Sequence, residues 1–377
     1  MIDLFRPFMS DGARVLVQKV LSYQSDGRLY IGEGQYVQEF ERILSATLGQ
    51  ETPPLLSVNS CTSALDLSLH LVGVKPGSEV ITTPMTCTAT NGVIVNRRAK
   101  IVWADVDPLT GLIDPLDVRK KITKNTKAII GVDWAGNPAN YLALKAFGLP
   151  VIQDAAHSFY IDRHNHGDYV ALSFQAIKHL TTTDGGALLV PPDQFDRARL
   201  LRWYGLDRTT GAADFRCEQD ITEAGYKYHM NNVAAAQGLG NLPYMSRNLS
   251  RCRENAEFYS KVLRGAPGIK TPQHTPGHSW WLYTILVDEP MAMRAWLKSQ
   301  GVDASPVHAR NDVHTAFKAA AKSHDELPGV NAFASHELAI PVGWWVTPDD
   351  RELVAAKVLG WADARGQSQQ KLEPATV

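Results

Sequence analysis

Between residues 55 and 190 the chain alternates short apolar segments, rich in β-branched residues, with stretches of helical periodicity. The short segments are predicted strands, at 55–59, 79–83, 100–105, 128–133, 150–154, 169–174 and 186–190. Helical stretches at 63–72, 89–95 and 115–122 separate the early strands as in βαβ units, so we expect a largely parallel, seven-stranded sheet. The last three strands follow one another closely, which predicts a local change of topology.

A chain of 377 residues exceeds one ordinary domain, and two domains are the expectation from length. Before the first strand we expect an arm with two helices and a glycine-rich turn, at 12–23, 37–48 and 30–35. After the last strand we expect a long connecting helix, then strands and helices, at 231–262, 280–287, 291–300, 305–309 and from 347 onward. The prediction is a large domain over 1–245 and a small α+β domain over 246–377, with a mobile polar tail from Gln367.

Charge and cysteine usage exclude several classes of protein. Lys and Arg total 38 against 39 Asp and Glu, so no overall field attracts nucleic acid or an anionic membrane. The chain contains no run of about eighteen apolar residues, so no membrane span is predicted. The four cysteines form no C-x-x-C pair, which argues against a disulfide framework or a zinc site and fits a cytoplasmic location. The histidines of 162–166 are interpreted as a solvated loop, so no metal is expected.

One lysine, Lys178, lies between two predicted strands and is followed by Thr, Asp and paired Gly. An amine held on such a connection near a strand end can be desolvated, which lowers its pKa and lets it attack a carbonyl to form a Schiff base. This is the linkage by which pyridoxal phosphate is held. The alternative is an ordinary surface lysine.

Upstream, Asp154-Ala-Ala-His157 follows an apolar strand. A carboxylate at this place can pair with the protonated pyridine nitrogen of a bound cofactor and so make its ring an electron sink. The alternative for Asp154 is a helix N-cap. His157 either contacts such a ring or is a satisfied polar residue.

A third segment, 57–67, reads as a strand, a turn of small residues and a helix start. The helix N-terminus and the hydroxyls of Thr62 and Ser63 would bind a phosphate, although ordinary Ser/Thr capping gives the same pattern. Neither a Walker loop nor a G-x-G-x-x-G turn occurs at a strand–helix junction, which disfavours an NTPase or a nicotinamide dehydrogenase. The pairs Trp280-Trp281 and Trp344-Trp345 are interpreted as packing of the small domain, with stacking in a cleft as the alternative.

Taken in order, these segments resemble the DegT/DnrJ/EryC1/StrS family of pyridoxal-phosphate-dependent sugar aminotransferases. The likeness covers nearly the whole chain. It rests on Tyr30-Ile-Gly-Glu-Gly-Gln, Asn59-Ser-Cys-Thr-Ser-Ala-Leu, Pro76-Gly-Ser-Glu-Val, Ala104-Asp-Val-Asp, Asp154-Ala-Ala-His, Ser173-Phe-Gln-Ala-Ile-Lys, Asp184-Gly-Gly, Gly225-Tyr-Lys-Tyr-His-Met and Ala234-Ala-Ala-Gln-Gly-Leu. The resemblance implies the aspartate-aminotransferase fold, with a three-layer large domain, a small C-terminal domain and a homodimer.

The resemblance also assigns roles to individual residues. Lys178 matches the Schiff-base lysine, Asp154 the acid on the pyridine nitrogen, and His157 the residue beside the ring. The phosphate positions match Thr62, Ser63 and Ser173, and Lys227 falls where relatives reach the phosphate of the neighbouring subunit.

Three positions depart from the family pattern. Cys61 stands where Gly is usual in the phosphate turn, which implies a less tight turn. Cys87 stands where many members carry an aromatic that stacks on the ring, so stacking is weaker or comes from another residue. His229 replaces a common Arg. Because Lys178 is retained, the resemblance favours a transaminase over the related sugar dehydratases.

The implied function is amino transfer from glutamate or glutamine to a keto sugar linked to a nucleotide, with ping-pong kinetics through a Schiff base on Lys178. His308, Arg310 and His314 are candidates for binding the diphosphate, with an ordinary polar loop as the alternative. Two other functions stay open. They are another pyridoxal-phosphate reaction, such as dehydration or amino transfer to a cyclitol, and a regulatory homologue without catalysis.

Overall fold

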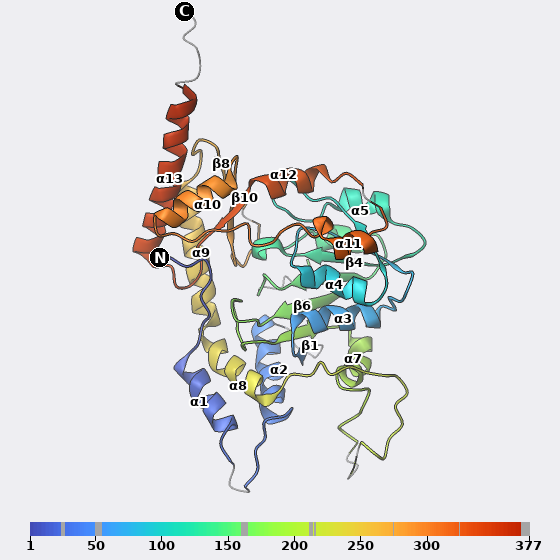
Figure 1. The fold of residues 1–377 in the computed structure, drawn as a ribbon. Coiled ribbons are helices and arrows are strands. Elements are labelled where there is room, and N and C mark those ends of the chain that lie inside the picture. The colour runs from blue at the N-terminus through green and yellow to red at the C-terminus, as the bar shows by residue number, and fades with distance from the viewer. Residues whose placement is uncertain are drawn as a thin grey trace, which may run out of the picture.

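A computed structural model describes residues 1–23, 27–49, 55–159, 165–210, 214, 216–273, 275–323 and 325–370, with side chains to 364. Its centre is a seven-stranded sheet in the order β1-β7-β6-β5-β4-β2-β3 (Figure 1). The strands are β1 (Leu55–Val58), β2 (Glu79–Thr82), β3 (Lys100–Trp103), β4 (Thr126–Val132), β5 (Val151–Ala155), β6 (Tyr169–Ser173) and β7 (Gly186–Leu189). All seven predicted strands are therefore confirmed.

The sheet is parallel except around β7. The pairs β2–β3, β2–β4, β4–β5 and β5–β6 are parallel, whereas β7 runs antiparallel to both β1 and β6. The predicted change of topology among the last three strands is thus confirmed. A short connection is sufficient between antiparallel neighbours, whereas parallel neighbours need a crossover.

Helices cover both faces of this sheet. They are α2 (Gln35–Leu48), α3 (Cys61–Leu71), α4 (Thr88–Asn96), α5 (Pro115–Lys121), α6 (Tyr141–Lys145), α7 (Phe195–Leu201) and α8 (Asn232–Asn241). In β6, Tyr169 and Ala171 belong to the apolar cluster under α3, whereas Val170 and Leu172 belong to the cluster with α2 and α8 residues. This alternation is what a strand buried on both faces requires, and it confirms the three-layer α/β architecture.

The C-terminal part contains a second, antiparallel sheet in the order β10-β9-β8. It comprises β8 (Ile269–Lys270), β9 (Tyr283–Val287) and β10 (Glu337–Ile340), with α9 (Met245–Val262), α10 (Pro290–Ser299), α11 (Thr315–Ala320), α12 (Pro328–His336) and α13 (Pro348–Gln370). Residues of α9, α10, α13 and this sheet share an apolar cluster of their own. The boundary at residues 245 and 246 stays a prediction.

The first residues of the chain lie against this C-terminal part. Ile2 pairs with Val302, and the Trp345 indole donates to the carbonyl of Asp3 at 2.8 Å. Helix α1 (Asp11–Val20) follows and packs on α8. The predicted arm therefore runs beside both parts of the molecule (Figure 1).

Two predicted elements are wrong in detail. The single helix over 231–262 is interrupted by a 3₁₀ turn at Leu242–Tyr244, because Pro243 has no N–H to donate. The strand over 305–309 is reduced to a bridge between Ser305 and Ala339. Pro306 cannot donate there and Val307 has a φ of 70°, so the extended chain stops, and β10 supplies the strand instead.

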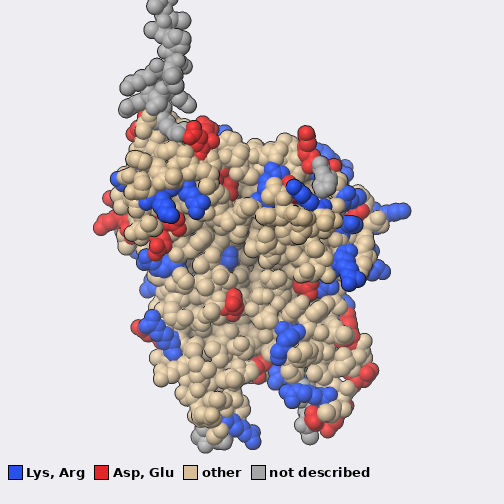
Figure 2. All heavy atoms as spheres, viewed as in Figure 1, with Lys and Arg blue, Asp and Glu red and all other residues tan. Residues whose placement is uncertain are grey.

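Helix α13 continues to Gln370 and so includes the start of the predicted tail, and residues 371–377 lie outside the described part of the chain. The mobility of the tail stays a prediction. In the described residues no helix has the length and apolarity needed to cross a membrane. On the face drawn in Figure 2, basic and acidic side chains are interspersed, as the formal net charge of -1 leads one to expect.

Candidate active site

The polar ends of several strands surround one cavity of about 450 Å³. It lies beyond the carboxyl ends of β4, β5 and β6, where ligands bind in open α/β sheets. Its lining includes Phe5, Ser60, Cys61, Thr62, Cys87, Thr90, Asp154, His157, Ser173, Lys178, Trp281 and His308. Most of the predicted site residues are thus brought together from segments that are far apart in the sequence.

Lys178 lies in the turn between β6 and β7, and its N–H donates to the carbonyl of Gln175 at 2.9 Å. Its amine is 3.6 Å from the ring centroid of Trp281. Burial lowers the pKa of Lys178 to about 8, against the opposing influence of Asp154. A surface lysine, the alternative considered from the sequence, does not describe this position.

Asp154 lies in β5 and is only 4% exposed. Its carboxylate accepts from the Thr90 hydroxyl at 2.6 Å and from the Ala156 N–H at 3.0 Å. Burial raises the pKa of this carboxyl, and the bond from Thr90 opposes the rise. The described residues that follow Asp154 form a turn and not a helix, so its alternative role as a helix cap is excluded.

His157 is buried beside these groups, and its ring stacks on Trp281 with centroids 3.9 Å apart. The ring of His308 is the other neighbour of the His157 ring, with 5.5 Å between the two centroids and 10° between the two planes. Burial and the Lys178 charge keep the pKa of His157 well below its ordinary value. The same two causes lower the pKa of His308 to about 4, so both imidazoles are neutral near pH 7.

The N-terminus of α3 forms one wall of the cavity. Ser60 caps this helix, since its hydroxyl accepts from the Ser63 N–H at 3.1 Å, and Thr62 is exposed. A Cβ on Gly186 would lie 2.7 Å from the nitrogen of Cys61, so β7 packs directly against this turn. The capping predicted as an alternative is therefore present, and it leaves the first turn of the helix facing the cavity.

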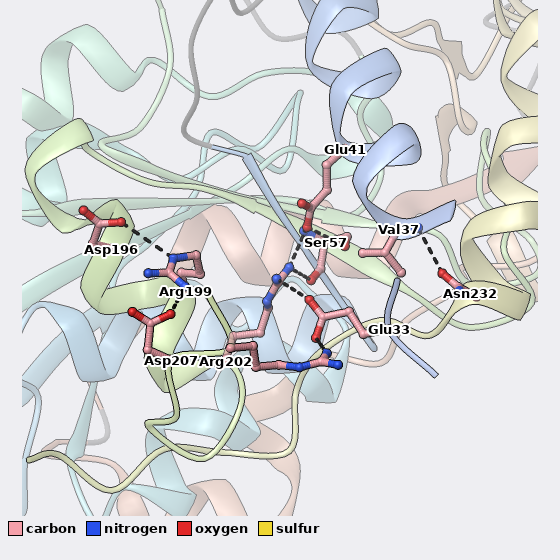
Figure 3. Close-up of polar contacts among 10 residues, drawn as sticks. Glu33, Val37, Glu41, Ser57, Asp196, Arg199, Arg202, Asp207 and Asn232 are labelled. Carbon is pink, nitrogen blue, oxygen red and sulfur yellow. Dashed lines mark hydrogen bonds and ion pairs between the residues drawn. The ribbon is translucent and has the colours of Figure 1, made fainter. Parts of the chain in front are cut away.

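A buried ion-pair network holds α2 and the segment before it against the sheet (Figure 3). Arg202 donates to the carboxylates of Glu33 and Glu41 and to the carbonyl of Ser57 in β1. Glu41 also accepts from the N–H and hydroxyl of Ser57, at 2.8 and 2.7 Å. Because β1 leads into the turn that caps α3, this network fixes the wall of the cavity from behind.

The remaining predicted residues lie at different distances from the cavity. His308 lines it, whereas the guanidinium of Arg310 is held by Asp312 and Asn331, and neither Arg310 nor His314 is among the lining residues. Lys227 is exposed, with its amine 5.4 Å from the ring of Tyr204, and does not line the cavity of its own chain.

Thr90 was not singled out from the sequence, because only the fold brings α4 against β5. Trp281 was interpreted as packing of the small domain, with stacking in a cleft as the alternative. Its ring lines the cavity, so packing alone does not describe its position. The described residues contain no group of three or more His, Cys, Asp or Glu that could hold a metal, and Asp162, Arg163 and His164 lie outside them.

A three-layer α/β fold with a desolvated lysine and a buried aspartate at adjoining strand ends defines the fold type I class of pyridoxal-phosphate enzymes. Residues 16–359 match the model of the DegT/DnrJ/EryC1/StrS aminotransferase family. The chain belongs to this family and is an aminotransferase.

Individual relatives agree with this assignment. The chain is 34% identical to the spore coat polysaccharide biosynthesis protein SpsC of Bacillus subtilis, over 73% of this chain and 74% of that protein. The structure of AtS13 from Actinomadura melliaura is 38% identical, with a TM-score of 0.88 over 96% of this chain and 98% of that one. The sugar aminotransferase CalS13 from Micromonospora echinospora is 34% identical, with a TM-score of 0.87 over 96% and 100%.

Proposed function

We propose that this aminotransferase uses pyridoxal phosphate to convert a nucleotide-linked keto sugar into an amino sugar, with glutamate or glutamine as the amino donor. The observation that carries the proposal is the approach of Lys178 and Asp154 in one cavity beside a helix N-terminus. The sugar as acceptor is supported by the similarity to CalS13, a sugar aminotransferase, and to SpsC, a polysaccharide biosynthesis protein. A cytoplasmic location and a homodimer belong to the same proposal.

The residues that line the cavity fit this cofactor. Thr62 in the first turn of α3 and Ser173 at the end of β6 offer N–H and hydroxyl donors for the phosphate, whereas the hydroxyl of Ser63 donates to Asn59 and this residue does not line the cavity. Asp154 offers a carboxylate for the pyridine nitrogen, and the Nδ1 atom of His157 is buried without a hydrogen bond in the described structure. When bound, pyridoxal phosphate supplies an electron sink that stabilises the carbanion formed from an amino acid.

Lys178 has two tasks in this proposal. Its amine would hold the aldehyde of the cofactor and, once the donor has taken its place, would accept the proton from the donor's α-carbon. An amine with a pKa of about 8 suits both tasks, because an appreciable neutral fraction exists near pH 7. Thr90 orients Asp154, and the neutral imidazole of His157 adds no second positive charge beside the lysine.

The donor half-reaction is tested by the absorbance spectrum of the holoenzyme before and after adding glutamate. We expect a visible band that glutamate bleaches, and we expect Lys178→Arg to abolish both the band and turnover. Lys145→Arg is the matched control, because that lysine pairs with Asp168 and does not line the cavity. A band indifferent to glutamate and glutamine would contradict the donor, and substantial turnover in Lys178→Arg would refute the assignment.

The sugar half-reaction depends on residues of the C-terminal part. His308 lines the cavity and is the first candidate to contact the acceptor, with Arg310 and His314 further along the same loop. We expect Arg310→Ala to weaken binding of the sugar substrate while the bleaching by glutamate keeps its rate. Unchanged affinity would remove Arg310 from the proposal. Product analysis separates amino transfer to a sugar from dehydration and from amino transfer to a cyclitol.

The shared site is tested by mixing two defective variants. In the proposal Lys227 acts on the phosphate bound by a second copy of the chain, so in a mixed dimer of Lys178→Arg and Lys227→Ala both defects fall in the same site. Mixed dimers would then contain one intact site, and random exchange would restore about a quarter of wild-type activity. No recovery after verified subunit exchange would place Lys227 outside the partner's site.

A further inference from the structure

Trp281 contacts the Lys178 region at two points. The indole ring lies under the lysine amine, with 3.6 Å between Nζ and the ring centroid. The indole N–H donates to the carbonyl of Ile177 at 2.9 Å, one residue before the lysine. One side chain therefore restrains both the backbone and the charged end of Lys178.

The indole is itself held in place by its neighbours. Phe5 stacks on it at a centroid distance of 5.0 Å and an interplanar angle of 28°, and His157 stacks at 3.9 Å and 24°. Only 6% of Trp281 is exposed. A ring fixed by two stacked partners and one hydrogen bond loses little further conformational freedom when it holds an amine.

The other groups near the amine are already engaged. The Asp154 carboxylate accepts from Thr90 and Ala156, and in the described structure the Lys178 amine forms no hydrogen bond or ion pair. An aromatic face attracts an ammonium group without accepting its proton, and a desolvated contact of this kind is stronger than an exposed one. A carboxylate in contact with the amine would favour the charged form of the lysine more strongly than the aromatic face does.

We propose that Trp281 is a positioning residue for Lys178, whose free amine rests on the indole face whenever it is not bonded to the cofactor. This inference rests on the proposed function. It adds that the Lys178 amine contacts the indole face between its two tasks. The amine stays within the cavity and remains able to give up its proton. Trp281 supplies an aromatic ring to this cavity, whereas Cys87, on the α4 side of the same cavity, has none.

The contact is tested first in the cofactor-free protein, by NMR of lysine labelled with ¹³C at the ε-carbon. The Lys178 signal is assigned by its loss in Lys178→Arg. Because the ring current of an indole acts on groups above its face, we expect this signal upfield of the other lysines. Trp281→Leu should return it to the common range, Trp281→Phe should keep part of the shift, and the control Trp280→Phe should leave it unchanged.

The role in catalysis is tested by the single-turnover rate at which glutamate bleaches the visible band. We expect Trp281→Leu to lower this rate about thirtyfold, the factor that corresponds to losing one desolvated cation–π contact. Trp281→Phe should recover most of the rate, and Trp280→Phe should match the wild type. If Trp281→Leu does not fold, the wild-type signal and Trp281→Phe still decide the question.

The outcomes separate this inference from the proposed function. An unshifted Lys178 signal in an active enzyme overturns the inference and leaves the aminotransferase assignment intact. A shifted signal with an unchanged bleaching rate in Trp281→Leu also overturns it, since the contact would then be structural. A wild-type protein that shows the shifted signal but no response to any amino donor contradicts the proposed function itself.

Discussion

The ionisation of Lys178 gives the sharpest test of the site. Burial lowers its pKa from 10.5 to about 8, so about 9% of the amine is neutral at pH 7, compared with about 0.03% for an unperturbed lysine. The neutral amine is the nucleophile that attacks the aldehyde. The structure therefore predicts that Lys178 reacts with pyridoxal phosphate at pH 7 about 300-fold faster than its ionisation as a free side chain would allow.

The assay is the initial rate at which the cofactor-free protein gains the visible band on mixing with pyridoxal phosphate, followed from pH 6 to pH 10. We expect the rate to rise about tenfold per pH unit and to level off above about pH 8. Lys178→Arg gives the background from other lysines. A rate that keeps rising to pH 10 would refute the argument from burial.

Asp154 supplies the perturbation. Its negative charge raises the pKa of Lys178 and so opposes the influence of burial. Removing the charge in Asp154→Asn should therefore move the midpoint of the profile to lower pH. Asp133→Asn is the matched control, because Asp133 is also buried but is not among the groups that act on Lys178. A midpoint that rises in Asp154→Asn would contradict the electrostatic reasoning.

Three further predictions follow from buried polar groups. Thr90→Val removes a hydrogen-bond donor that lowers the pKa of Asp154, so this pKa should rise. The acid limb of the pH–rate profile should then move to higher pH, and Thr90→Ser should return it to the wild-type position. Arg202→Met leaves the Glu41 carboxylate without a cation, while Glu33 keeps Arg208, and should cost about 3 kcal/mol of unfolding free energy in urea. Arg199 is more exposed and is drawn beside Arg202 in Figure 3, so Arg199→Met should cost under about 1 kcal/mol of unfolding free energy. Equal losses in the two variants would contradict the argument from burial. Burial raises the folded-state pKa of Glu337 well above 4.5, so its contribution to stability is present below pH 4.5 and is lost as the pH rises. Relative to the wild type, Glu337→Gln should therefore gain stability as the pH increases above 4.5, and a constant difference in urea unfolding would oppose this.

The main sheet could be predicted from the sequence because each strand carries its own signal. Strands buried on both faces are continuous apolar runs, and such a run can be recognised without knowing which strands lie beside it. Lys178 and Asp154 could be singled out for the same reason, since Asp154 lies at the end of a run of this kind and Lys178 lies shortly after one. The polar ends of parallel strands meet at one edge of a sheet, so their convergence followed from the α/β pattern.

Other features depended on contacts that no local pattern contains. Strand β10 was missed because its pairing partner in β9 lies about fifty residues away, while Pro306 interrupted the segment that had been predicted in its place. Within the site, Thr90 reaches Asp154 across 64 positions, and Trp281 reaches Ile177 across 104. Apolar periodicity and strand-end chemistry are properties of neighbouring residues, so the sequence by itself determined the α/β sheet and the lysine–aspartate pair. The groups that orient that pair come from distant segments, and their positions exist only once the tertiary packing has brought α4 and the start of β9 against the cavity.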